Sequence, residues 1–239
     1  PPATPTPTPT PPPATPSPTP AATPTPSPSP SCTPGAGNSY LYALNDDSTG
    51  SFIYGFQVNE STGALTGLAG FPVAAQNGGI NSIVSERMTV DQANGRVYVI
   101  NDSSDTVSAY TINPTTGALT AMPFSPISLG TGTWNTIVVH PSGSPLVIGS
   151  NATNGPVHSF AITSTTATPA AGSPYPMGAA VAGFSSRMSQ DGNFYYVGGN
   201  LGANIGGFSV DSGTGVLTTV AGSPFPTVVG TLSYATYGA

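Results

Sequence analysis

Short apolar strands separated by polar turns recur along the chain from about residue 36 onward. The clearest element is a strand of the form apolar-x-x-aromatic-x-apolar, which occurs as IYGFQV (53–58), VSAYTI (107–112), VHSFAI (157–162) and IGGFSV (205–210). Its aromatic residues are Phe56, Tyr110, Phe160 and Phe208, spaced by 54, 50 and 48 residues. A repeat of this length predicts a row of equivalent structural units.

Other elements recur in phase with the aromatic strand. A second strand precedes it, as YLYALND (40–46), RVYVIND (96–102), PLVIGSN (145–151) and FYYVGGN (194–200). Turns of sequence TGALT or TGVLT follow, at Leu65, Leu119 and Leu217, and the third copy degenerates to TTATP (165–169). A Pro-aromatic corner comes next, as GFP (70–72), PFSP (123–126), GSPYP (172–176) and GSPFP (222–226).

Each unit therefore holds three or four short strands bounded by turn residues, and no helical period is visible. This pattern favours an all-β fold of the β-propeller type, with four repeats forming blades of antiparallel strands.

The first 35 residues differ from the rest of the chain. They hold 16 of the 28 prolines, mostly alternating with Thr or Ser. Proline fixes φ and pushes the preceding residue toward extended geometry, so an extended polyproline II segment is expected. We therefore expect a Pro/Thr/Ser-rich stalk over residues 1–35 and a four-repeat β-propeller-like domain over residues 36–239.

The composition of the stalk is also typical of O-glycosylated segments, and an unmodified linker is the alternative. The candidate O-glycosylation sites are Thr4, Thr6, Thr8, Thr10, Thr15, Thr19, Thr23 and Thr25. Sequons for N-glycosylation stand at Asn59, Asn101 and Asn151, at predicted strand ends or turns.

The two ends of the propeller-like domain complement each other. After GSPFP the chain continues as TVVGTLSYATYGA, which is typical of the first strand of a blade, whereas the domain opens at YLYALND, a second strand. We expect residues 231–237 to pair beside residues 40–45, closing one ring or joining neighbouring chains. The residues assigned to this blade closure or inter-subunit strand are Leu232, Tyr234, Tyr237, Tyr40 and Tyr42.

Charge narrows the choice of partners. Only 5% of the residues are charged, and the chain has three arginines, no lysine and nine carboxylates. It cannot provide the row of cations that neutralising phosphates requires, which disfavours nucleic acid and anionic membranes as partners. No apolar run is long enough to span a bilayer, so membrane insertion is not expected.

Few residues in the sequence suggest a catalytic or ligand-binding role. His140 and His158 are expected to be structural, and no G-x-S-x-G motif is present, so no catalytic residue is assigned. Glu86, Arg87 and Arg187 are expected to form a structural ion pair. The glycine-rich run 198–207 lies between predicted strands, which is typical of a hairpin connection and not of a phosphate-binding loop.

Asn and Asp residues end two of the predicted strands, where they could bind Ca²⁺ or serve the turns. They are Asn45, Asp46, Asp47, Asn101, Asp102 and Asp105. The turn role is favoured, so no metal site and no cofactor are assigned. The only cysteine, Cys32, excludes an intrachain disulfide.

The combination of VYVIND, a TG-x-LT turn and a GSPFP corner resembles the YVTN and lactonase-like β-propeller repeats of bacterial extracellular proteins, over residues 36–239. The resemblance implies a ring of blades and, in the enzymes, acidic and basic side chains around the central channel. Those enzymes have more blades than the four repeats found here, so either the ring is small or several chains share it.

The expected function is that of an extracellular structural protein at the cell surface, a subunit of a fibre or surface assembly. Its partners would be other copies of itself, as a homo-polymer or homo-oligomer, and glycans. The alternative is a stalk-displayed propeller module that binds carbohydrate or protein, and a lactonase-like hydrolase is the third hypothesis.

Overall fold

The computed structural model describes residues 1–2, 38–47, 50–75, 86–198 and 204–227. The chain divides into two units, residues 1–35 and residues 36–239. The predicted stalk beyond residue 2, with its threonines, lies outside the described residues, as do Leu232, Tyr234 and Tyr237. Within the described part, no helix is long and apolar enough to span a membrane.

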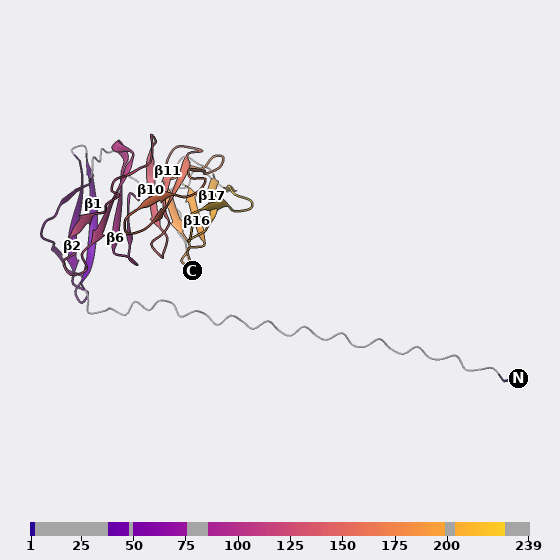
Figure 1. Cartoon of the computed structure of the whole chain (residues 1–239), viewed down its shortest axis with the longest axis horizontal. Helices are drawn as coiled ribbons and strands as arrows, with labels where there is room; N and C mark the ends of the chain where they lie inside the picture. Colours follow the sequence, from indigo (N-terminus) through magenta and orange to yellow (C-terminus); the bar gives the residue numbers. More distant parts are fainter. Residues whose placement is uncertain (3–37, 48–49, 76–85, 199–203, 228–239) are drawn as a thin grey trace. The chain divides into compact units, whose positions relative to one another are not determined.

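Antiparallel sheets make up the described part of the second unit, as Figure 1 shows. Sheet 1 holds β1 (Ser39–Asp47), β2 (Gly50–Val58), β3 (Leu65–Gly67) and β4 (Val73–Ala75). Sheet 2 holds β5 (Met88–Asp91), β6 (Arg96–Asn101), β7 (Thr106–Ile112), β8 (Leu119–Ala121) and β9 (Ile127–Ser128). Sheet 3 holds β10 (Trp134–Val139), β11 (Leu146–Ser150), β12 (Pro156–Ile162), β13 (Ala167–Pro169) and β14 (Tyr175–Pro176). Sheet 4 holds β15 (Ser185–Met188), β16 (Phe194–Gly198), β17 (Asn204–Val210), β18 (Leu217–Thr219) and β19 (Phe225–Pro226).

These strands confirm the all-β prediction. The one helical element of the described residues is a short 3-10 turn, η1 (Asp102–Ser104).

The recurring aromatics occupy equivalent positions in the four sheets. Each of these aromatics lies in the strand equivalent to the third strand, in chain order, of a five-stranded sheet. They are Phe56 in β2, Tyr110 in β7, Phe160 in β12 and Phe208 in β17. Each lies opposite one residue of the preceding strand, and these pairs are Leu41–Phe56, Val97–Tyr110, Leu146–Phe160 and Tyr195–Phe208. The four sheets therefore share one register, as the spacing predicted.

The turn after each aromatic strand is also built the same way. A side-chain oxygen accepts hydrogen bonds of 2.9–3.2 Å from the backbone N–H groups two and three residues later. The four acceptors are Asn59, Asn113, Thr163 and Asp211. Thr163 performs this role in the third copy, so the turn survives although its TG-x-LT sequence has degenerated.

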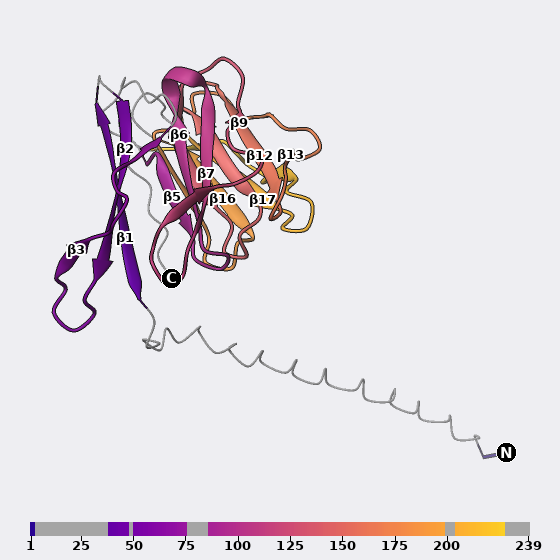
Figure 2. The same ribbon diagram turned by 60° about the vertical axis from the view of Figure 1, so that its left-hand side comes forward.

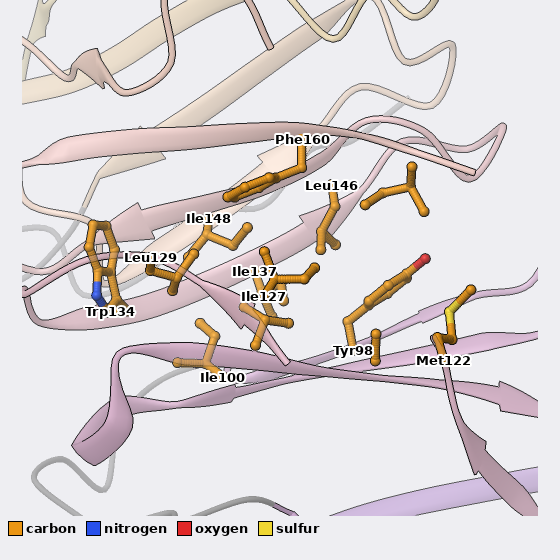
Figure 3. Close-up of a cluster of buried hydrophobic side chains, with 13 residues drawn as sticks. Tyr98, Ile100, Met122, Ile127, Leu129, Trp134, Ile137, Leu146, Ile148 and Phe160 are labelled. Carbon is orange, nitrogen blue, oxygen red and sulfur yellow. The ribbon is translucent and has the colours of Figure 1, made fainter. Parts of the chain in front are cut away.

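Consecutive sheets pack face to face through apolar side chains. Figure 3 shows the cluster between sheets 2 and 3, in which Tyr98 and Ile100 of β6 meet Ile137, Leu146 and Ile148 of sheet 3. A second cluster joins sheets 3 and 4, and a third joins sheets 1 and 2. Among the described residues, no such cluster joins sheet 4 to sheet 1.

Sheets 2, 3 and 4 each begin with a short strand at one edge, and these strands, β5, β10 and β15, are called the inner strands below. β10 contacts both β5 and β15, so the inner strands lie side by side. In sheet 1 the described residues contain no inner strand, and β1, the equivalent of β6, β11 and β16, stands at that edge. This agrees with the prediction that the domain opens at a second strand.

Candidate functional site

Five polar residues lie along the inner strands, four of them near the strand beginnings and Arg187 further along β15, and they are called the start cluster below. Glu86 and Arg87 come just before β5, Asp102 begins η1 after β6, Asn135 lies in β10 and Arg187 lies in β15. The cluster draws on sheets 2, 3 and 4 and contains two of the three arginines of the chain. In a protein with so few charges, this is a marked concentration.

Arg87 forms the buried half of the start cluster. Its Nη2 donates to Oδ2 of Asp102 at 3.2 Å and to Oδ1 of Asn135 at 3.1 Å. The Arg87 side chain is 4% exposed and the Asp102 side chain 9%. The other oxygen of Asp102 accepts the backbone N–H of Trp134 at 3.1 Å, so this carboxylate ties sheet 2 to sheet 3. A buried charge paired and hydrogen-bonded in this way is primarily structural.

Arg187 and Glu86 form the accessible half of the start cluster. The two guanidinium Nη atoms donate to the two oxygens of Glu86, which stands 101 residues earlier in the chain. The Arg187 side chain is 36% exposed and that of Glu86 34%. Hydrogen bonding to Glu86 raises the pKa of Arg187, against a smaller effect of burial. The predicted ion pair is thus confirmed, and both its charges reach solvent.

Several polar groups beside the start cluster form no hydrogen bond of normal geometry within the described structure, although three of the hydroxyls lie near one another. They are Nδ2 of Asn135 and the hydroxyls of Thr136, Ser186 and Tyr195, all buried. Burial raises the pKa of Tyr195 to about 12, with the hydroxyls of Ser186 and Thr136 acting in the opposite direction. Buried polar groups are normally satisfied, and exceptions are common at functional sites.

The opposite ends of the inner strands lead into hairpin turns. Asp91, His140 and Ser189 stand at equivalent positions there and are buried. A pocket of about 250 Å³ opens beside this end, lined by Val90, Asp91, Gln92, Ala93, Val139, His140 and Pro141. Burial lowers the pKa of His140 although Asp191 acts to raise it, so the imidazole is neutral near pH 7. Its Nδ1 is bonded to Oγ of Ser142 at 2.8 Å, which marks it as part of the turn.

Other predicted residues serve the scaffold. Asp105 accepts hydrogen bonds from the backbone of Gly132 and from Nε1 of Trp134. His158 lies edge-on to Trp134, and burial lowers its pKa. Asn45, Asp46 and Asp47 belong to β1. The described residues contain no group of three or more His, Cys, Asp or Glu side chains placed to hold a metal ion.

The remaining predicted sites differ in accessibility. Asn59 is exposed and Asn151 is half-buried, whereas Asn101 is fully buried and its Nδ2 donates to Thr106 and Ser108. The sequon at Asn101 therefore presents no exposed amide in the folded sheet. The hydroxyls of Tyr40 and Tyr42 donate to the carbonyls of Pro114 and Gly117, so both side chains contact sheet 2.

Sequence reasoning pointed to Glu86, Arg87 and Arg187 but missed Asn135 and assigned Asp102 to a turn. Asp102 does begin a turn, and its carboxylate also reaches Arg87. Asn135 carries no sequence signal beyond its position in a mostly apolar inner strand, WNTIVV. A polar residue inside such a run is the one clue available from sequence.

No family model and no curated protein matches the chain. Solved structures do match. A Lactobacillus plantarum protein is 19% identical with a TM-score of 0.57, over 76% of this chain and 51% of that one. A candidate 6-phosphogluconolactonase from Bacteroides fragilis is 18% identical with a TM-score of 0.53, and the match covers 76% of this chain and 53% of that one.

A further candidate 6-phosphogluconolactonase, from Bacteroides uniformis, is 14% identical with a TM-score of 0.50, over 75% of this chain and 67% of that one. This chain thus spans about half the length of the first two structures and two thirds of the third. Identities this low bear on the fold alone. Together with the four equivalent sheets, they show that the domain has a β-propeller-type fold similar to that of these solved structures.

Proposed function

We propose that this protein is a lactonase-like hydrolase whose reaction takes place at the accessible half of the start cluster. The observation that carries the proposal is the Glu86–Arg187 pair, a carboxylate and a guanidinium about one third exposed, at the inner strands of a propeller similar to candidate lactonases. Convergent charged groups of this kind are the usual basis for a site hypothesis.

Opening a lactone needs a base for water and a positive group for the developing oxyanion. In the proposed reaction Glu86 takes a proton from water as the water oxygen attacks the carbonyl carbon. Arg187 donates hydrogen bonds to the resulting oxyanion. The ring C–O bond then breaks, and the leaving oxygen takes the proton back from Glu86, which yields an open hydroxy acid.

The rest of the cluster would hold the reacting pair in place. Arg187 also donates to the backbone carbonyl of Ser186 at 2.7 Å, and the backbone carbonyl of Glu86 accepts the N–H of Ile137 at 3.2 Å. Both partners of the pair are thus anchored to strands. The formal net charge of −6 favours neutral sugar lactones over phosphorylated ones.

The test is turnover of glucono-δ-lactone and of 6-phosphogluconolactone by the purified chain, followed by acid release and corrected for spontaneous hydrolysis. Glu86→Gln is expected to lower kcat/KM about 100-fold or more. Glu60→Gln, which changes an exposed carboxylate in the turn after β2, should leave it unchanged. Failure to exceed the spontaneous rate, or full activity of Glu86→Gln, would contradict the proposal.

Secretion, glycosylation and assembly remain proposals that are supported by sequence composition alone, namely the Pro/Thr/Ser-rich first 35 residues and the low content of charged residues. We place the protein outside the cell on these grounds. Glycans on the stalk threonines, or on Asn59 and Asn151, would appear as an excess over the 23.7 kDa of the chain in an intact mass measurement. The comparisons give no support to a fibre-forming role.

A further inference from the structure

An asparagine followed by a glycine lies in the turn between β5 and β6, at the far end of the inner strands from the start cluster. Figure 2 shows these two strands side by side in sheet 2. Asn94 is exposed, and Gly95 has φ 60°, a conformation that glycine adopts without strain. Asparagine amides are chemically labile, and a following glycine has no Cβ to shield its backbone nitrogen from the amide carbon. This pair is therefore a candidate modification site.

The backbone N–H of Gly95 is available for reaction. Among the residues that the structure describes, it donates no hydrogen bond. The second described Asn-Gly pair, Asn154–Gly155, differs, because Gly155 is buried and its N–H donates to the carbonyl of Ala152 at 2.8 Å. Breaking a buried hydrogen bond has a cost in free energy. Asn94 is therefore expected to be the more reactive of these two asparagines.

The side-chain amide of Asn94 is restrained by acceptors from two sheets. Its Nδ2 lies 3.3 Å from Oδ1 and 3.0 Å from Oδ2 of Asp91, which ends β5, and it donates to the carbonyl of Ser142 in the sheet 3 hairpin at 3.1 Å. A Cβ on Gly143 would lie 1.9 Å from this nitrogen, so the amide packs directly on that hairpin. The contact of Asn94 with the sheet 3 hairpin is called the hairpin bridge below.

We infer that Asn94 is a site of spontaneous deamidation, and that the reaction breaks the hairpin bridge. The backbone nitrogen of Gly95 loses its proton to a base in the solvent and attacks Cγ of Asn94. The new N–Cγ bond closes a succinimide ring, the Cγ–Nδ2 bond breaks, and Nδ2 takes up a proton from water and leaves as ammonia.

Water then opens the succinimide ring in one of two ways. Cleavage of the bond between Cγ and the Gly95 nitrogen leaves aspartate. Cleavage of the bond between that nitrogen and the main-chain carbonyl carbon of residue 94 leaves isoaspartate. In both cases the net reaction converts an amide and water to a carboxylate and ammonium, with no change of oxidation state.

Both products remove the donor on which the hairpin bridge depends. A carboxylate has no hydrogen to donate, so its oxygens would face only acceptors, namely the Asp91 carboxylate and the Ser142 carbonyl. Asp91 is 2% exposed, so water screens the repulsion between the two carboxylates poorly. Isoaspartate also adds a backbone atom to the turn. The contact between the two hairpins is therefore expected to be lost.

The same contacts control the rate of the reaction. Cγ of Asn94 can approach the Gly95 nitrogen only when the amide leaves Asp91 and Ser142. The folded chain should therefore react more slowly than the unfolded chain, and weakening these contacts should make the folded chain react faster.

Peptide mapping of the full chain after incubation in neutral buffer measures the reaction. The chain has no lysine and has arginines at 87 and 96, so trypsin releases residues 88–96 with a single asparagine. Deamidation raises the mass of this peptide by about 1 Da, and chromatography separates aspartate from isoaspartate. We expect residue 94 to be modified, at least 10-fold faster in chain unfolded by guanidinium chloride. An unmodified residue 94 in the folded chain, or equal rates in both states, overturns the inference.

Two variants test the restraint and the nucleophile. Asp91→Ala removes two of the three acceptors and should speed modification of the folded chain about 10-fold, whereas Gly95→Ala shields the nitrogen and should slow it. Circular dichroism verifies that each variant is folded, and Asp91→Asn, which keeps the volume and one acceptor, replaces Asp91→Ala if that variant does not fold. Rates unchanged by these substitutions contradict the proposed reaction. A chymotryptic digest reports on Asn154, and faster modification there contradicts the assigned order.

Asn94→Asp tests the loss of the hairpin bridge without the reaction. It should lower the midpoint of urea unfolding and raise hydrogen exchange of residues 140–145 about 10-fold. Asn113→Asp is the matched control, because the Asn113 side chain only accepts hydrogen bonds and Asp211 accepts the equivalent ones in sheet 4. An Asn94→Asp chain that matches wild type in both measurements, or an equal loss in Asn113→Asp, overturns this part of the inference.

Discussion

The two ends of the inner strands use polar residues in opposite ways. At the start, partners come from distant parts of the chain, since Arg87 and Asn135 are 48 residues apart and Glu86 and Arg187 are 101 apart. At the far end, most polar side chains bond within their own turn, although Asn94 also donates to the carbonyl of Ser142 in the turn of sheet 3 at 3.1 Å. Asp91 accepts the N–H of Asn94, His140 accepts that of Ser142, and Ser189 accepts that of Phe194, all within five residues.

This contrast separates two kinds of polar residue in one repeat. The turn end satisfies most of its polar side chains within a single hairpin. The start end satisfies some polar groups only across sheets and leaves Asn135 Nδ2 without a hydrogen-bond partner in the described part. Hydrogen bonds within one turn stabilise the scaffold, whereas polar side chains that come together from several sheets form a candidate site.

The largest expected effect lies within the start cluster. Arg87→Met should lower the free energy of unfolding by about 3 kcal/mol or more, because it leaves the buried Asp102 carboxylate without its cation. Arg187→Met should cost less than about 1 kcal/mol, since its pair with Glu86 is partly exposed. Urea unfolding of the two variants measures the difference. Equal losses would remove the distinction between a structural and an accessible half.

At the turn end, the free energy of unfolding is expected to be sensitive to added side-chain volume. Gly192 has φ 78°, and a Cβ there would overlap the His140 ring. Gly192→Ala should therefore cost about 2 kcal/mol or more. Gly63 is the matched control, with φ 69° and open space around it, so that Gly63→Ala reports the backbone cost of about 1 kcal/mol alone. Equal unfolding midpoints in urea would show that the turn yields to the extra methyl group.

The smallest effect at neutral pH is expected at Tyr195. Burial raises its pKa from 10 to about 12 in the folded chain, so stability is full below pH 10 and falls between pH 10 and 12 as the unfolded chain ionises. Tyr195→Phe should reduce that alkaline loss by up to about 3 kcal/mol and change stability little at pH 8. Tyr54→Phe, an exposed tyrosine, is the control. Parallel curves of unfolding free energy against pH for wild type and Tyr195→Phe would contradict the burial of this hydroxyl.

Strand positions in this domain could be predicted because the repeat encodes them locally. The aromatic strands, the Pro corners and the second strands all appear where the spacing placed them, and even the degenerate turn at Thr163 keeps its hydrogen bonds. Each of these features depends on residues within about 15 positions of one another.

The candidate site could be predicted only in part because its contacts cross sheets. Sequence reasoning named the charges but could not show which of them would be buried. It also gave Asn101 as a possible glycosylation site at a strand end, and Asn101 is buried at the end of β6 beside Ser108 of the neighbouring strand. Burial at a strand end depends on the sheet that packs over it, and the sequence of one repeat does not carry that information.

The shared register of the four sheets also bears on how such a domain changes over time. Because neighbouring sheets pack through apolar residues at equivalent strand positions, gain or loss of a whole repeat by duplication or deletion of its coding segment is expected to leave apolar side chains on both sides of the new contact. The number of units in a closed ring is then governed by the angle between neighbours. Within the start cluster, the partly exposed Glu86 and Arg187 can diverge between units, whereas Arg87 and Asp102 also hold sheet 2 to sheet 3.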